Sequence, residues 1–222
     1  MRISPYGQSC VLINLSEEVS EENSLKVQKI CIALEQLELS FIASVIPSYC
    51  SIAVKYLPSK INFSELNELI KGLDYENVLL PTEKEHVIPV CYDKSLAQDL
   101  DVVCNITSLS PKEVMELHVE STYSIFAIGF VPGFFYLGGL NPKLVVPRKE
   151  VPLVKVPKGA VGIAANQTGI YPLETPGGWQ LIGRTPLPSL LFDPLEVDKY
   201  KIGDRIRFEP ISLNTFKKLC DG

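Results

Sequence analysis

The alternation of apolar and polar positions in the first 84 residues predicts a small α/β unit. Three apolar runs of strand length occupy residues 9–15, 40–47 and 50–57. The last two are close enough in sequence to form a strand pair, with the turn near Pro47 and Ser48. Two segments with helical spacing complete the unit, and this order of elements predicts an open sheet covered on one face.

The first helical segment begins after Ser20, whose side chain can cap the helix, and Glu21 and Glu22 favour its first turn. The second helical segment follows the strand pair. In each segment the apolar residues recur three or four positions apart, so that they share one face. They are Val27, Ile30, Cys31, Leu34 and Leu37 in the first segment, and Phe63, Leu66, Leu69 and Ile70 in the second. We see no catalytic constellation in this unit.

The pattern changes around Pro81, which we take as a boundary between a domain at 1–84 and a domain at 85–222. Beyond it, one helix is clearly signalled, because Ser110 can be its N-cap, Pro111 its first residue and Glu113 the partner in a capping box. Short strand candidates separated by Gly and Pro surround this helix. They are residues 86–92, 122–130, 160–165, 178–183 and 204–210. Many short strands with one helix predict a closed or nearly closed β-barrel, and the fold class is therefore α+β.

The composition excludes several classes of protein. With 46% hydrophobic and 21% charged residues the chain is typical of globular proteins, and no run of about 18 apolar residues could span a membrane. The N-terminus lacks the apolar region of a signal peptide. A net charge of -5 argues against binding nucleic acid through its phosphates. The six cysteines contain no CxxC, which favours buried free thiols in a cytoplasmic protein over a disulfide framework.

Motifs for metals and nucleotides are missing from the sequence. Only two histidines are present, His86 and His118, and no cysteine spacing typical of a zinc site accompanies them, so we expect this chain to bind no metal. Neither GxxxxGK[ST] nor GxGxxG occurs. A bound nucleotide would therefore need groups from elsewhere.

Residues 129–186 are unusual, because they hold most of the 14 glycines and about half of the 17 prolines. Such a composition indicates a backbone that follows a particular winding path. The segment also carries six basic residues against Glu150 and Glu174, a balance of +4 in an acidic chain. We call these six the basic island: Lys143, Arg148, Lys149, Lys155, Lys158 and Arg184.

Five motifs in this segment occur in order and together resemble one family. They are GF-x-PGF-x-YL-x-GL from Gly129, PR at Pro147, VP-x-G from Val156, QTGIYP from Gln167 and PGGW-x-LIGRTP from Pro176. This pattern is similar to that of the family of bacterial 5-oxoprolinase B subunits, also called allophanate hydrolase subunit 1, which includes the kinase inhibitor KipI. The resemblance covers about residues 85–210.

The resemblance implies a fold, a set of partners and a reaction. The fold is a small N-terminal α/β domain followed by a cyclophilin-like β-barrel. The partners are a KipA-like protein (the C subunit) and a LamB/YcsF-like protein (the A subunit). By this resemblance the complex opens the lactam of 5-oxoproline to glutamate at the expense of ATP and its Mg ion, and this chain is expected to be inactive alone. Two alternatives stay open: a KipI-like protein that inhibits a sporulation histidine kinase, and a component of urea or allophanate metabolism.

Two positions depart from the family pattern. Members often carry a second arginine where this chain has Leu153, which removes a positive charge, and often have IAG where this chain has an alanine at Ala165. The first change puts in doubt any role of that second arginine in anion binding, whereas we expect the second to alter only the local freedom of the backbone.

Candidate site residues follow from their chemistry. Arg148 and Arg184 offer guanidinium groups for a carboxylate or phosphate, although Arg184 could instead brace backbone carbonyls. His118 could transfer protons or simply end its helix. Neutral groups for an amide-like lactam are Gln167, Thr168 and Tyr171, unless this segment is only a turn. The residues expected to shape the site are Pro132, Gly133, Gly177, Gly178 and Trp179, the last of which could also fill the core.

Overall fold

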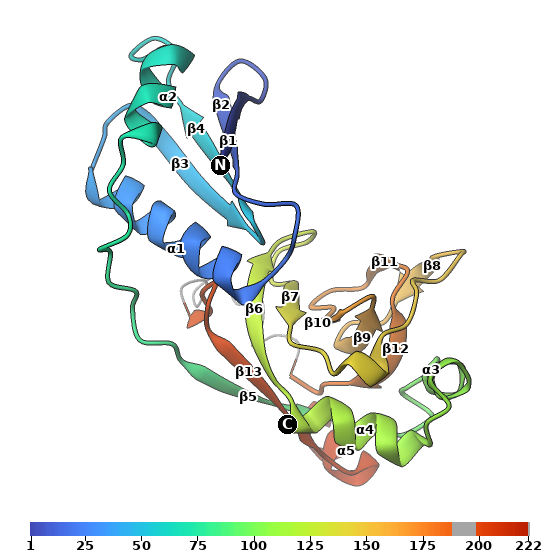
Figure 1. Cartoon of the computed structure of the whole chain (residues 1–222). Coiled ribbons are helices and arrows are strands. Elements are labelled where there is room, and N and C mark those ends of the chain that lie inside the picture. Colours follow the sequence, from blue (N-terminus) through green and yellow to red (C-terminus); the bar gives the residue numbers. More distant parts are fainter. Residues whose placement is uncertain (188–198, 222) are drawn as a thin grey trace. The chain divides into compact units, whose positions relative to one another are not determined.

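Each of two units has its own main sheet in the computed structural model, which describes residues 1–187 and 199–221 (Figure 1). The units are Met1–Thr82 and Glu83–Gly222. The first has a four-stranded antiparallel sheet in the order β1-β2-β4-β3. Its elements are β1 (Arg2–Pro5), β2 (Cys10–Asn14), α1 (Glu21–Gln36), β3 (Ile42–Ser48), β4 (Ser51–Tyr56) and α2 (Phe63–Lys71).

The predicted elements of the first unit are present. The side chain of Ser20 caps α1 by accepting a hydrogen bond from the backbone N–H of Asn23 at 3.2 Å. The apolar faces of α1 and α2 bury against alternate residues of β2 and β4 such as Ile13 and Ile52. Leu37 is an exception, because α1 ends at Gln36 and the Leu37 side chain is 45% exposed.

The second unit is built on a seven-stranded sheet in the order β12-β9-β10-β7-β6-β13-β5. All neighbours are antiparallel except β13 and β5, which run parallel with Arg205 opposite Glu85. A separate two-stranded ribbon joins β8 and β11. The elements are β5 (Glu85–Val90), α3 (Leu100–Thr107), α4 (Pro111–Glu120), β6 (Thr122–Ile128), β7 (Phe135–Gly138), η1 (Pro142–Leu144), β8 (Leu153–Val156), β9 (Ala160–Ala164), β10 (Gln167–Ile170), β11 (Thr175–Gly177), β12 (Gln180–Arg184), β13 (Arg205–Pro210) and α5 (Leu213–Asp221).

The seven-stranded sheet curls until its two edges touch. Cys91 follows the edge strand β5 and Arg184 ends the other edge strand β12. Their backbones exchange two hydrogen bonds, with N–H to O distances of 2.8 Å and 2.9 Å. The mixed α+β class is thus confirmed, and this bridge closes the sheet.

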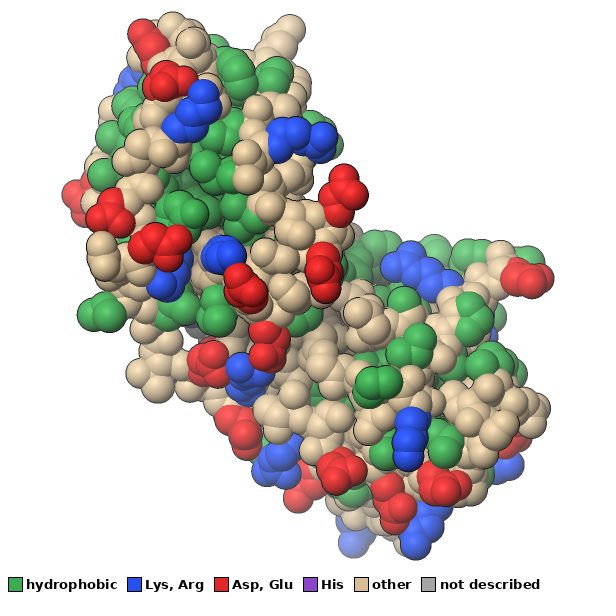
Figure 2. Space-filling view, viewed as in Figure 1, with side chains coloured by type: hydrophobic (Ala, Val, Ile, Leu, Met, Phe, Trp, Pro, Cys, Tyr) green, Lys and Arg blue, Asp and Glu red, His purple; other side chains and the backbone are tan. Residues whose placement is uncertain are grey.

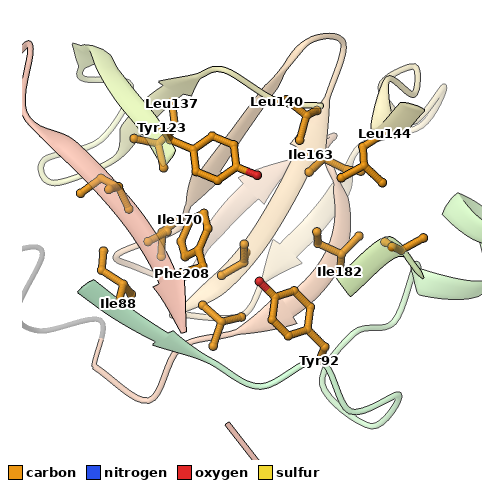
Figure 3. Close-up of a cluster of buried hydrophobic side chains, with 14 of the residues drawn as sticks. Ile88, Tyr92, Tyr123, Leu137, Leu140, Leu144, Ile163, Ile170, Ile182 and Phe208 are labelled. Carbon is orange, nitrogen blue, oxygen red and sulfur yellow. The ribbon is translucent and has the colours of Figure 1, made fainter. Parts of the chain in front are cut away.

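The interior of the curled sheet is filled with aliphatic and aromatic side chains (Figure 3). Tyr123 from β6, Phe208 from β13 and Ile182 from β12 point toward one another across it. Helix α4 contributes to this core and begins as predicted, because Ser110 and Glu113 form both hydrogen bonds of a capping box. The helix therefore fixes the position of the residues at its C-terminal end, among them His118.

Three expectations for this unit were wrong or incomplete. Residues 167–170 form β10, so the alternative that this segment is only a turn is wrong. A second and a third helix, α3 and α5, accompany the predicted one. All six cysteines are free, but only Cys31 and Cys91 are buried. Among the described residues, no helix combines the length and the apolar character needed to cross a membrane.

Candidate functional site

An aromatic pocket of about 350 Å³ opens beside the β8–β11 ribbon in the second unit. Its walls are the rings of Phe134, Tyr136, Tyr171 and Trp179. Lys149, Gly177 and their neighbours line the rest of the pocket, and Arg148 supplies an exposed guanidinium group. The pocket therefore combines flat apolar walls with positive charge, in a volume suited to a small molecule.

The aromatic rings of the pocket wall pack against one another, mostly edge to face. The ring centroid of Phe134 lies 5.1 Å from that of Tyr171 at 78° and 5.5 Å from that of Trp179 at 86°. A third neighbour, Tyr136, lies 4.7 Å away at 60°. Near-perpendicular pairs are a favoured aromatic geometry. Trp179 is buried in a separate cluster with Phe134 and Tyr171 and lines the pocket, so it forms part of the pocket wall and does not belong to the core inside the curled sheet.

Two glycines shape the backbone around these rings. A Cβ at Gly177 would lie 2.5 Å from the Tyr171 hydroxyl oxygen, so any larger residue would displace that ring. Gly133 has φ of +80° in the turn between β6 and β7, a conformation that glycine adopts without strain. This turn, which also contains Pro132, places Phe134 in the pocket wall.

The two cations of the pocket differ in their surroundings. Arg148 is exposed and makes no ion pair or hydrogen bond within the described part of the chain. Its charge is felt by Tyr171: burial raises the pKa of that phenol to about 12, and the nearby guanidinium opposes the rise. Lys149, by contrast, is mostly buried and forms an ion pair with Asp99.

Asp99 was not singled out by sequence reasoning, yet it connects three segments around the pocket. One carboxylate oxygen contacts the Lys149 ammonium, and the other accepts a hydrogen bond from the Leu181 N–H at 2.8 Å. The backbone N–H of Asp99 donates in turn to the Leu181 carbonyl at 3.0 Å. The only available signal was an acidic residue before an apolar helical spacing, which indicates the N-cap position that Asp99 occupies before α3.

His118 lies outside this pocket, in a buried chain of hydrogen bonds. Its Nδ1 lies 2.7 Å from the Tyr92 hydroxyl and its Nε2 lies 2.9 Å from the Thr168 hydroxyl. Thr168 donates to the Gly162 carbonyl at 3.0 Å, so its oxygen accepts from His118. The imidazole therefore carries its proton on Nε2 and accepts from Tyr92 on Nδ1.

The surroundings of this imidazole keep it neutral. His118 has no exposed surface, and burial lowers its pKa to about 3. Its ring stacks on Phe208 with centroids 4.7 Å apart. These contacts are typical of a structural residue. His118 does not line the pocket, and its role in proton transfer stays a prediction.

The structure brings together only part of the predicted set. Arg148, Tyr171, Gly177, Gly178 and Trp179 line the pocket. Gln167 and Thr168 lie on β10 and do not line it. Arg184 donates from Nε to the Lys158 carbonyl at 2.8 Å, which is the bracing contact considered as its alternative role.

The basic island does not form one continuous basic surface. Lys149 pairs with Asp99, and Lys155 pairs with Glu174 at 3.2 Å. Acidic and basic side chains are interspersed over the visible face of the second unit (Figure 2). Within the described residues no three His, Cys, Asp or Glu side chains cluster as metal ligands would. The candidate site is therefore the aromatic pocket with Arg148.

Comparison with known proteins gives consistent relatives. Residues 1–201 match the family described as carboxyltransferase domain, subdomain C and D. The 5-oxoprolinase B subunit of Bacillus subtilis (strain 168) is 36% identical over 228 residues, which cover 95% of this chain and 93% of the relative.

Solved structures extend this likeness. TTHA0988 superposes with a TM-score of 0.79 at 34% identity, over 91% of this chain and 40% of that one, so this chain spans less than half of TTHA0988. The urea amidolyase of K. lactis superposes with a TM-score of 0.81 over 99% of this chain and 15% of that one. At 16% identity this last match shows a shared fold alone.

Proposed function

Because this chain belongs to the family of 5-oxoprolinase B subunits, we propose that it is the B subunit of an ATP-dependent 5-oxoprolinase. It acts in the cytoplasm with a KipA-like C subunit and a LamB/YcsF-like A subunit. We also propose that its two units are separate domains, the second a cyclophilin-like barrel. The observation that carries the proposed activity is the aromatic pocket with an exposed guanidinium at Arg148.

The chemistry of the pocket suits 5-oxoproline, a flat five-membered lactam with one carboxylate. The aromatic walls contact the faces of the ring, and the fork of Arg148 binds the carboxylate. Tyr171 is a donor for the lactam oxygen, because burial raises its pKa to about 12 and the phenol keeps its proton near neutral pH. The lactam then lies with its carbonyl toward a neutral donor and its carboxylate toward the rim.

The reaction needs ATP because resonance makes an amide carbonyl a poor electrophile. Transfer of the γ-phosphoryl group to the lactam oxygen releases ADP and activates the ring carbon. One water adds to that carbon, the C–N bond breaks, and a second water removes the phosphate to leave glutamate. The residues of this chain hold and orient the lactam during these steps.

ATP and its Mg²⁺ bind to a site that this chain shares with the KipA-like protein. The sequence has no glycine-rich nucleotide motif, and the described residues hold no cluster of carboxylates that would bind a metal. We therefore expect the isolated chain to hydrolyse no ATP. The exposed side chains of Phe130, Val151 and Val154, near the pocket, provide apolar surface for the KipA-like protein.

The test is reconstitution with partners recovered from the native lysate by a tagged copy of this chain. We expect the KipA-like and LamB/YcsF-like proteins to be recovered and the complex to convert 5-oxoproline and ATP to glutamate, ADP and phosphate. Arg148→Ala should lower turnover by about 10–100-fold at subsaturating substrate, as expected for loss of a charged hydrogen bond. Recovery of a histidine kinase without these two proteins would favour the inhibitor function instead.

A further inference from the structure

The charge of the aromatic pocket depends on the carboxylate of Asp99, which does not itself line the pocket. Two cationic residues line the pocket, Arg148 and Lys149. Only Lys149 is neutralised, because its ammonium pairs with the buried carboxylate of Asp99. Of the charged residues that line the pocket, Arg148 alone has no acidic partner among the residues the structure describes.

We infer that the Asp99–Lys149 pair makes this pocket selective for a small monoanion with a flat apolar body, and against a dianion. A first carboxylate on the ligand meets the guanidinium of Arg148. A second carboxylate would find aromatic rings and an ammonium that is already paired. Burying an unpaired charge is costly, so the dianion is rejected.

Asp99 is well placed to hold this arrangement. It is buried, and both of its carboxylate oxygens are engaged, one by the Lys149 ammonium and one by the Leu181 N–H at 2.8 Å. The Lys149 backbone is fixed as well, because its N–H donates to the Gly178 carbonyl at 2.7 Å. The ammonium is thus held on Asp99 while the neighbouring Arg148 stays exposed. Asp99 is a positioning and selectivity residue, since its effect on the ligand passes through Lys149.

The inference rests on the proposed function only in taking the same pocket as the ligand site. It concerns the isolated chain and requires neither ATP nor partners. A complex that fails to turn over 5-oxoproline would contradict the proposed function and leave this selectivity in place. Loss of the selectivity in an active complex would contradict only the inference.

The test compares two ligands with the same ring, cyclopentanecarboxylate and trans-1,2-cyclopentanedicarboxylate, at pH 8 and low salt. Trp179 is the only tryptophan and lines the pocket, so its fluorescence reports occupancy of this site. We expect the wild-type chain to bind the monoanion at least tenfold more tightly. Asp99→Asn keeps an oxygen acceptor for Leu181 but frees the Lys149 charge, and should raise the relative affinity for the dianion about tenfold.

Two further variants keep the test decisive. Asp101→Asn changes an exposed carboxylate of the same helix, paired with Lys94, and should leave the ligand preference unchanged. Lys149→Gln removes the cation and leaves Asp99 unneutralised, so the dianion should lose still more affinity than the monoanion. Equal affinities in the wild type, an unchanged ratio in folded Asp99→Asn and Lys149→Gln, or no fluorescence response to either ligand would overturn the inference.

Discussion

Two groups of polar and aromatic side chains lie in the second unit, one closed and one open. Around His118 the hydrogen bonds end on buried groups, at Tyr92 and, through Thr168, at the Gly162 carbonyl. Around Arg148 the aromatic rings are equally well packed, but the guanidinium is exposed and lines a pocket. Satisfied polar groups stabilise a fold, whereas a group left available can bind a ligand. The residue types alone do not separate these two cases.

Removing the His118 side chain should have the largest effect on stability. His118→Ala leaves the Tyr92 hydroxyl without its acceptor and creates a cavity, so we expect a loss of about 3–5 kcal/mol in the free energy of unfolding. Urea unfolding followed by Trp179 fluorescence measures it. Lys112→Ala, on the exposed face of the same helix, should change stability by less than about 0.5 kcal/mol. A His118→Ala protein of normal stability that lacks turnover would instead indicate a chemical role.

Truncating Arg148 should have the opposite profile, a large effect on binding and little on stability. Arg148→Ala should weaken binding of a monocarboxylate to the isolated chain by about 10–100-fold. Fluorescence titration of Trp179 measures the affinity, and urea unfolding measures the stability. Lys158→Ala is the matched control, because Lys158 is an exposed cation of the basic island that does not line the pocket. Equal effects of the two variants would show that only general charge attracts the ligand.

The closed network should also make stability depend on pH. The pKa of His118 is about 3 in the folded chain and about 6.5 when unfolded, so the unfolded state binds the extra proton between these values. The contribution of His118 is present above pH 6.5 and is lost as pH falls toward 3. We expect it to decrease by about 2 kcal/mol between pH 7 and pH 5. Urea unfolding of His118→Gln at both pH values should show a correspondingly smaller decrease, and an identical decrease would contradict a buried neutral imidazole.

The smallest expected effect concerns Ala165, which connects the two groups. It has φ of +49° in the hairpin before β10, the strand that carries Thr168. Its N–H donates at 2.7 Å to the carbonyl of Val146, just before the segment of Arg148. Ala165→Gly should stabilise the chain by about 0.5 kcal/mol, because glycine adopts positive φ more easily. Its neighbour Asn166 does not share the positive φ, so Asn166→Gly should not stabilise, and thermal unfolding compares the two variants.

The elements predicted correctly from the sequence were those that depend on residues close together in the chain. The capping box of α4 was predicted in full, since Ser110, Pro111 and Glu113 act within four residues of one another. Strand β10 was harder, because its Gly169 indicates a turn when read alone. In the structure a Cβ there would lie 2.7 Å from the Phe135 carbonyl oxygen, so the glycine is required by a neighbouring strand rather than by a turn.

Prediction of the site residues was limited in the same way to what local sequence patterns indicate. The family motifs pointed to Arg148 and Trp179, which line the pocket, and to Arg184, whose side chain binds a carbonyl instead. Asp99 carried no motif, because its partner Lys149 lies 50 positions later in the chain. Which of several similar side chains has a partner depends on such distant contacts, and these do not appear in the local pattern.

The parallel pair of β5 and β13 has a consequence for the synthesis of the protein. The two strands are paired residue by residue, yet 120 positions separate Glu85 from Arg205. At a usual rate of 5–20 residues per second, a ribosome takes roughly 6 to 24 seconds to make that stretch. During this time β5 has no neighbour on that side and offers an unpaired edge to other chains. The nascent protein is therefore most open to aggregation, and to the help of a chaperone, in the seconds before its last strand emerges.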